Sequence, residues 1–319
     1  MTDLALRVGQ ETDGLASGGV AEPRRPRPLR MLFIAVALAA CFVAIRLGLR
    51  DAPLLWFAAL RAIVAGVVLV LMAGVQRRPM PSGVRAWGLI TVLGLVNVTV
   101  AFAAMFAGVS ELATGTAAVL ANAQPLLILL PAWWLYGEAV SLRTAGALLA
   151  GFTGLVLVAV PGGGGGGAAL SVLSAVAITG GTLLARRLGG LDVIMAIGWH
   201  FIIGGAALVI FAAAVEGPPV IAWTPRFVAV LAFLAIVGTA VTTVLWFIEA
   251  RRSRLDVLTA WTFLTPVLGI VLAAVVFGEQ PTGWTAVGLV TVLVAMWLVV
   301  RPARERNPER RVPFWRARE

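Results

Sequence analysis

Ten apolar runs, each about 20 residues long, constrain the fold of this chain more than any other feature. They cover residues 31–49, 53–75, 86–108, 112–136, 142–160, 168–186, 191–214, 227–249, 254–277 and 283–300. A helix needs about 20 apolar residues to cross the hydrocarbon core of a bilayer. The strands of a membrane barrel would instead alternate polar and apolar residues over about ten positions. The runs therefore predict an all-α membrane protein with ten transmembrane helices.

The second half of the chain repeats the first at an offset of 141 residues. Pro125 and Glu138 in the first half correspond to Pro266 and Glu279 in the second. The same offset relates Arg46 to Arg187, Asp51 to Asp192, and Arg85 to Arg226. A register shared over about a hundred residues indicates internal duplication. Because five spans cross the membrane an odd number of times, we expect two inverted five-helix repeats.

The distribution of basic residues predicts the topology. All 25 are arginine; with a cytoplasmic N-terminus, 21 lie inside, Arg50 and Arg226 lie outside, and Arg46 and Arg61 lie within spans. Positive charge accumulates on the cytoplasmic side, so we expect a multi-pass protein of the plasma (inner) membrane with both termini in the cytoplasm. The net charge of +10 therefore follows topology and does not indicate a nucleic-acid partner. A basic tail of this kind suits anionic lipid.

The predicted organisation has five segments. These are a disordered cytoplasmic leader (1–28), a first repeat with spans 1 to 5 (29–160), a glycine hinge (161–167), a second repeat with spans 6 to 10 (168–300) and a basic cytoplasmic tail (301–319). In span 5, Gly146, Ala150 and Gly154 form a small-residue face. Such a face fits close packing inside the bundle or self-association, so both a monomer and a homodimer are consistent with the sequence.

Polar and aromatic side chains near mid-depth are the candidate substrate-binding residues. They are Asn97, Asn122, Gln124, His200, Thr242, Trp261 and Thr265. Pro125 and Pro266 each remove a helical hydrogen bond, and breaks at matching positions of inverted repeats indicate a transporter binding site. Each candidate has a structural alternative, because polar residues in spans often bond to neighbouring helices.

Three charged residues and the only histidine allow two interpretations each. Arg61 lies about eight residues into span 2, roughly 12 Å from its end; it is either a structural arginine bonded to carbonyls or to Glu111, or a substrate-facing one. Glu138 and Glu279 are expected to bond to backbone at helix ends rather than to act in transport. His200 is either a structural residue or the relay for a driving proton.

Three stretches resemble a known family. They are FVAIRLGLRDAPLLWFAALR, ATGTAAVLANAQPLLILLPAWWLYGEAVSLRTAGALLAG and DVLTAWTFLTPVLGIVLAAVVFGEQPTGWTAVG. Five spans with a proline inside the fourth and Gly-Glu at its end resemble the EamA domain of the drug/metabolite transporter superfamily, over about residues 31–300. The resemblance implies a ten-helix bundle with a central cavity that works by alternating access. It also implies export of amino acids or related amphipathic metabolites.

We therefore expect a secondary transporter of small metabolites. A channel or facilitator is the alternative, and a membrane enzyme is a third, although the spans contain one histidine, one cysteine and no cluster of carboxylates from which to build an active site. The expected partners are a small-molecule substrate and the lipid bilayer, with a proton or counter-substrate as a further candidate. We expect neither a cofactor nor a metal.

Overall fold

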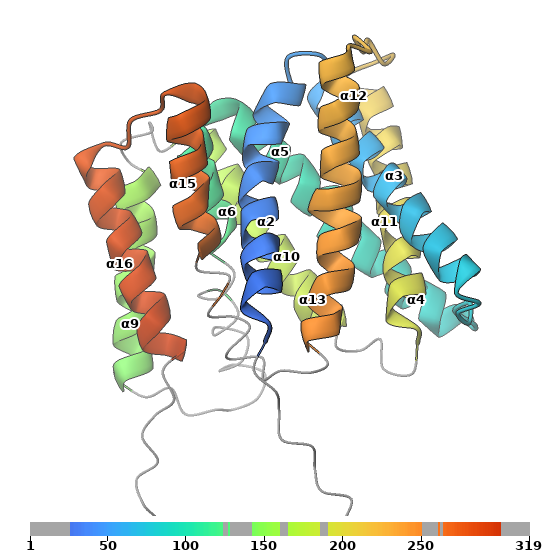
Figure 1. Cartoon of the computed structure of the whole chain (residues 1–319), viewed down its shortest axis with the longest axis horizontal. Helices are drawn as coiled ribbons and strands as arrows, with labels where there is room; N and C mark the ends of the chain where they lie inside the picture. The colour runs from blue at the N-terminus through green and yellow to red at the C-terminus, as the bar shows by residue number, and fades with distance from the viewer. Residues whose placement is uncertain are drawn as a thin grey trace, which may run out of the picture.

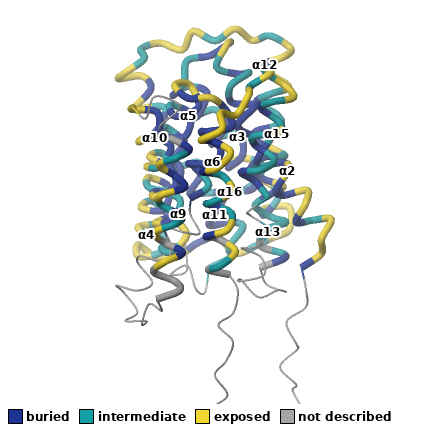
Figure 2. The backbone as a smooth tube through the Cα atoms, turned by 90° about the vertical axis from the view of Figure 1, so that its left-hand side faces the viewer, coloured by how far each residue is buried: buried dark blue, intermediate teal, exposed yellow. Residues whose placement is uncertain are grey.

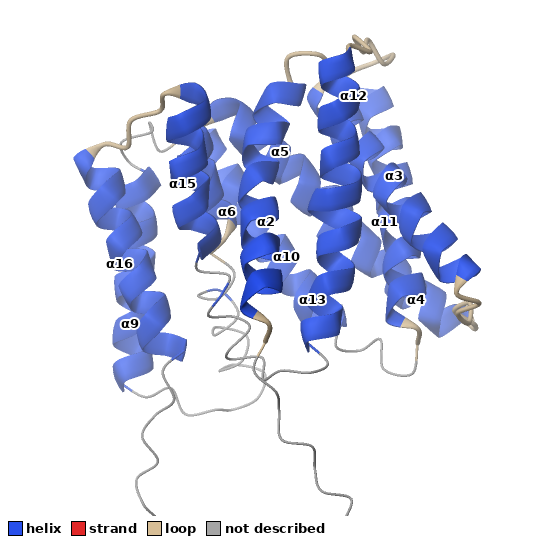
Figure 3. Ribbon diagram, in the orientation of Figure 1, coloured by secondary structure: helices blue, strands red, loops and turns tan. Residues whose placement is uncertain are grey.

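Every regular element in the described part of the chain is helical (Figure 3). The computed structural model describes residues 26–123, 127, 142–159, 165–185, 191–250, 261 and 264–300. Gln124, Pro125 and Glu138 lie outside these residues.

The described helices group into ten consecutive segments, as the apolar runs predict. In the first repeat they are α2 (Pro28–Gly48), α3 (Leu54–Val75), α4–η1–α5 (Val84–Gly94, Leu95–Val100, Ala101–Glu111), α6 (Thr114–Ala121) and α9 (Leu142–Ala159). In the second they are α10 (Gly166–Ala185), α11 (Val193–Val215), α12–η4–α13 (Pro225–Ala232, Phe233–Val241, Thr242–Ala250), α15 (Leu264–Phe277) and α16 (Gly283–Val300). Helix α10 begins at Gly166, so the last two glycines of the predicted hinge are helical.

Six of these segments are long and apolar enough to cross a membrane by themselves. Their exposed surface is apolar as well: Leu71, Ile210 and Val215 are each more than 60% exposed. A protein in water would bury such side chains, whereas hydrocarbon solvates them. Figure 2 shows the buried backbone concentrated in the interior of the bundle. The protein is therefore a multi-pass helical membrane protein.

The packing of helices follows an approximate two-fold relation between the repeats. Three helices pack against their own counterparts: α3 against α11, α6 against α15, and α9 against α16 (Figure 1). The third span packs against the sixth through α5 and α10, and equivalently the first packs against the eighth through α2 and η4. Helix α2 begins and α16 ends at the same end of the bundle (Figure 1). These contacts are those of two inverted repeats.

Glycine determines how closely the edge pair α9 and α16 can approach. A Cβ on Gly154 would lie 2.9 Å from the carbonyl oxygen of Gly288, and a Cβ on Gly288 would lie 2.7 Å from that of Gly154. Among the described residues, nothing lies within 4 Å of the Cβ position of Gly146. The small-residue face of span 5 is thus used inside the bundle at Gly154.

Helices α6 and α15 run antiparallel. Position 125 follows the end of α6, and its counterpart Pro266 lies in α15. Gly115 lies against Ile270, and Gly269 lies against Ala118. Helix α6 ends at Ala121, four residues before position 125. The described parts of spans 4 and 9 therefore pack on each other.

Candidate functional site

Two π-helical segments interrupt the third and eighth spans at equivalent positions. η1 covers Leu95–Val100, and the offset of 141 moves this range onto 236–241, within η4 (Phe233–Val241). A π-helix makes i→i+5 hydrogen bonds, so its turn holds an extra residue, and it is frequent at functional sites. Each segment presents a polar side chain to a helix of the other repeat.

The first contact centres on Arg61 of α3, whose side chain is buried at 4% exposure. Its Nε donates to Thr239 Oγ1 of η4 at 3.2 Å, and its Nη2 lies 3.8 Å from Cys41 Sγ of α2. The guanidinium carbon lies 4.6 Å from the ring centroid of Phe102 and 5.9 Å from that of Phe106, both on α5. This cation–π geometry partly replaces the hydration that the guanidinium has lost.

The predicted partners of Arg61 were wrong. The carboxylate of Glu111 lies near the start of α10, where a Cβ on Gly166 would be 3.1 Å from its Oε2. None of the ion pairs among the described residues includes Arg61. Its Nη1 is buried and has no hydrogen-bond partner in the described part of the chain. A buried cation without a counter-charge is costly, which makes this arginine an unusual structural element.

The second contact joins two of the predicted site residues. Asn97 Nδ2 of η1 lies 3.5 Å from His200 Nε2 of α11. His200 Nδ1 lies within hydrogen-bond distance of the carbonyl oxygen of Ile197. Because a carbonyl only accepts, Nδ1 carries the proton, and Nε2 of the neutral ring accepts from Asn97. The Oδ1 of Asn97 is buried without a partner.

The two contacts are related by the duplication. The offset of 141 places Arg61 at position 202, two residues from His200, and Asn97 at position 238, next to Thr239. Each contact therefore joins the second span of one repeat to the π-helix in the third span of the other. We take this pair of inter-repeat contacts as the candidate functional site.

The other predicted candidates lie elsewhere in the bundle. Asn122 Nδ2 donates to the carbonyl of Ala118 in its own helix, and Thr242 Oγ1 donates to the carbonyl of Gly238 in its own span. Trp261 packs at the edge of a small cluster with Met31 and Ile34 of α2. The structural alternative considered from the sequence was a bond to a neighbouring helix, whereas Asn122 and Thr242 bond within their own spans.

Thr265 differs from these residues, because its Oγ1 is fully buried and has no hydrogen-bond partner. Counting one helical turn from the contact between Ala118 and Gly269 brings Asn122 level with Thr265. Asn122 and Thr265 therefore place a second set of polar groups where α6 and α15 meet.

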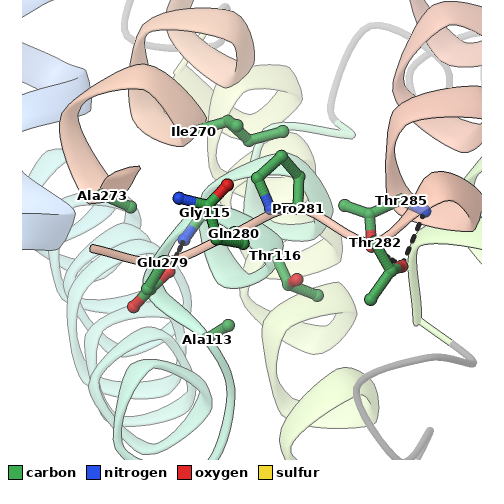
Figure 4. Close-up of a pocket in the computed structure, with 10 residues that line it drawn as sticks. All are labelled: Ala113, Gly115, Thr116, Ile270, Ala273, Glu279, Gln280, Pro281, Thr282 and Thr285. Carbon is green, nitrogen blue, oxygen red and sulfur yellow. Dashed lines mark hydrogen bonds between the residues drawn. The ribbon is translucent and has the colours of Figure 1, made fainter. Parts of the chain in front are cut away.

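Glu279 caps a helix of the other repeat. Its carboxylate accepts from the backbone N–H of Thr114 at 2.9 Å and of Gly115 at 3.2 Å, at the N-terminus of α6. Negative charge is favourable there, because the first N–H groups of a helix have no intrahelical acceptor. The carboxylate also borders a small pocket between α6, α15 and the start of α16, with Thr116, Thr282 and Thr285 in its lining (Figure 4).

Other charged residues join the repeats at both ends of the bundle. At the end that holds Glu279, the carboxylate of Glu216 accepts from the backbone N–H of Leu55 and Trp56 at the start of α3. At the same end, Arg226 donates to both carboxylate oxygens of Asp51, at 2.7 and 3.0 Å. The hydrogen bond from Arg226 holds the pKa of Asp51 below its usual value.

The opposite end carries two more contacts between the repeats. Arg30 pairs with the buried Glu249, and Arg78 pairs with Asp192. Burial raises the pKa of Asp192, but the backbone N–H of Met195 and the guanidinium of Arg78 outweigh that effect, and the pKa is lowered. The two repeats are thus tied at both membrane faces.

Sequence reasoning missed several members of the site: Cys41, Phe102, Phe106 and Thr239. Periodicity does not distinguish a π-helix from an α-helix, so nothing marked η4 as special. One signal was available, because applying the 141-residue offset to Asn97 leads to the position next to Thr239.

A family model described as the EamA-like transporter family matches this chain twice, over residues 29–160 and 165–301. A WAT1-related chloroplast protein of Arabidopsis thaliana is 32% identical over 260 residues, which are 77% of this chain; the match spans about 62% of that protein's length. An uncharacterized transporter of Synechocystis is 27% identical and the match covers 81% of this chain and 84% of that protein. Protein PecM of Dickeya dadantii is 26% identical, with 78% and 83% covered.

A solved crystal structure has the same fold. It superposes with a TM-score of 0.61 at 20% sequence identity, and the match covers 85% of this chain and 94% of the other. At that identity the likeness concerns the fold alone.

Proposed function

Because the chain belongs to the EamA-like transporter family, we propose that it is a secondary transporter that exports small amphipathic metabolites by alternating access between its two repeats. The proposed substrates are amino acids or related compounds. The proposed location is the plasma (inner) membrane, with both termini in the cytoplasm.

The pair of equivalent contacts at the π-helices carries this proposal. Arg61 contacts Thr239, and His200 lies beside Asn97, so each contact crosses from one repeat to the other. Alternating access in inverted-repeat transporters moves one repeat against the other around a site near mid-depth. π-helical segments are rare overall but frequent at functional sites, and here they lie at the contacts between the repeats.

The contacts at the two ends of the bundle support the same mechanism. Asp51 with Arg226 at one end, and Glu249 with Arg30 at the other, connect the repeats at opposite faces. A transporter opens one face while the other stays closed, so one set of contacts has to break while the other holds.

A channel or facilitator is the alternative function, and flux kinetics separate a channel from a transporter. Purified protein in proteoliposomes is loaded with unlabelled amino acid, and uptake of the labelled compound is followed. A transporter gives saturable uptake that is accelerated by internal substrate, because the loaded carrier returns faster. Linear, unsaturated flux without this counterflow would overturn the proposal.

The substrate for that assay comes from a growth screen. Cells with and without expression of the protein are exposed to toxic amino acids and analogues, and an exporter protects against the compounds that it carries. The variant Gly146→Ala is a matched control for expression, because its new methyl group meets nothing within 4 Å. Sensitisation to the active compounds, rather than protection, would reverse the proposed direction.

The coupling partner is proposed to be a proton or a counter-substrate. If a proton drives transport, we propose that it passes through His200. In the neutral ring, Nε2 accepts a hydrogen bond from the Asn97 amide. After protonation Nε2 would donate instead, and rotation of the Asn97 amide would offer it Oδ1, which has no partner among the described residues. The contact between His200 Nε2 and the Asn97 amide can therefore be made in either protonation state.

A further inference from the structure

The guanidinium of Arg61 has one edge, formed by Nη1 and Nη2, where the described residues offer only a sulfur atom as hydrogen-bond acceptor. Arginine has five N–H donors in a planar fork. Nε uses its donor on Thr239, one Nη2 donor faces the Cys41 sulfur at 3.8 Å, and Nη1 has no partner. Sulfur is a weak acceptor, so the edge formed by Nη1 and Nη2 is the unsatisfied one. This is the edge that binds a carboxylate through two parallel hydrogen bonds.

The charge of Arg61 is also unbalanced within the described residues. The acidic residues there lie at helix ends: Asp51, Glu249 and Asp192 pair with other arginines, and Glu216 and Glu279 accept backbone N–H groups. Glu111 lies against the start of α10. A neutral ligand would leave the buried charge uncompensated, whereas an anion would balance it.

The surroundings of Arg61 select among anions. The guanidinium lies over the Phe102 ring with Phe106 nearby, and the third neighbour is a thiol. There is one cationic group and one hydroxyl in this shell, so it can satisfy one carboxylate but not a multiply charged phosphate. The aromatic walls favour an apolar body attached to that carboxylate.

The position of Arg61 connects such a ligand to movement of the repeats. Arg61, Cys41 and Phe102 belong to the first repeat, and Thr239 belongs to the π-helix of the second. Nη1 is enclosed in this structure, so a ligand reaches it only after the helices around it move, and a movement of η4 away from α3 would expose it. The same movement is the one that alternating access requires.

We propose that Arg61 binds the carboxylate of an apolar organic anion through its Nη1 and Nη2 edge, and that such monocarboxylates are the substrates of this protein. This inference rests on the proposed transport function. Thr239 acts as a positioning residue, because it holds Nε and thereby directs the free edge.

A binding measurement tests the site without requiring transport. The full chain is purified into lipid nanodiscs, and its melting temperature is recorded with increasing phenylacetate or phenylacetamide. The two probes have the same ring and nearly the same shape, and only phenylacetate carries a negative charge. We expect phenylacetate to raise the melting temperature in a saturable way and phenylacetamide to leave it unchanged.

Two variants assign the response to Arg61. Arg61→Lys keeps the charge but loses the two-pronged edge, and we expect the phenylacetate concentration for half of the shift to rise about tenfold or more, as for loss of one charge-assisted hydrogen bond. Arg46→Gln is the matched control. Arg46 is another arginine within a span, but its Nη1 donates to the carbonyls of Val109 and Leu112. We therefore expect Arg46→Gln to need the same phenylacetate concentration as the wild type for half of the shift (the half-point), whatever its basal stability.

Three results would overturn the proposal. They are an equal response to both probes, an unchanged half-point in Arg61→Lys, and an equal shift with chloride or inorganic phosphate, which would show a general anion site. Counterflow separates the two proposals: an Arg61-dependent phenylacetate shift without counterflow of any amino acid or monocarboxylate leaves the site standing and removes the transport function. Counterflow of neutral compounds without a phenylacetate shift does the reverse.

Discussion

Adding one methyl group at Gly154 should separate helices α9 and α16. A Cβ there would lie 2.9 Å from the carbonyl oxygen of Gly288 and 2.8 Å from Val292 Cγ2. Ordinary carbon contacts are about 3.5–4.0 Å, so the helices have to move apart by roughly 0.5–1 Å. Overpacking of this kind costs about 1–3 kcal/mol, against a gain of about 1 kcal/mol because alanine favours a helix interior over glycine.

Gly146→Ala on the same helix isolates the steric part of this cost. That substitution brings the same gain in helix propensity, and its methyl group meets nothing within 4 Å. The difference in unfolding free energy between Gly154→Ala and Gly146→Ala should therefore be about 1–3 kcal/mol. The measurement is the SDS-induced unfolding of each purified variant in mixed micelles, followed by circular dichroism.

The double variant Gly154→Ala/Gly288→Ala adds a second check. One separation of the helices relieves both clashes, because each new methyl group meets the backbone of the other glycine's helix. The double variant should lose less stability than the sum of the two single losses, as expected for residues in contact. Equal stability of Gly154→Ala and Gly146→Ala, or strict additivity of the double variant, would refute the close contact of α9 with α16.

Three further predictions concern charged and titratable residues. Glu279→Ala leaves the N–H groups of Thr114 and Gly115 without their acceptor, so it should lower the unfolding free energy by about 1–3 kcal/mol. Glu279→Gln keeps one acceptor oxygen and should lose less stability. Equal losses of stability for the two variants in the SDS titration would contradict the capping role. The pKa of Asp51 lies below its usual 3.8 because Arg226 donates to it. The ion pair therefore stabilises the folded protein above pH 3.8, and this stabilisation is lost as the pH falls through the lowered pKa. The melting temperature of Asp51→Asn should lack this acid-dependent part, and an unchanged pH profile would count against the ion pair. If a proton drives transport, His200→Ala should remove the pH dependence of uptake into proteoliposomes, and full pH-dependent uptake by that variant would end the proton-relay proposal.

The amino-acid sequence by itself determined the membrane class, the ten spans and the duplication. These properties are linear: the length of an apolar run has to match the thickness of a bilayer, and a repeated register is visible without knowing any contact. The offset between Pro125 and Pro266 sets the length of the repeat, and that length holds five spans. Because five crossings are an odd number, the second copy has to be inverted relative to the first.

Only the tertiary structure decided which polar groups meet. Arg61 bonds to Thr239 rather than to Glu111, although Thr239 is 178 residues away in sequence. Asn97 lies beside His200, whereas Asn122 and Thr242 bond within their own spans. These outcomes depend on which face each helix presents to which neighbour and on the extra residue that a π-helix inserts, and an apolar run of constant hydropathy carries no record of either.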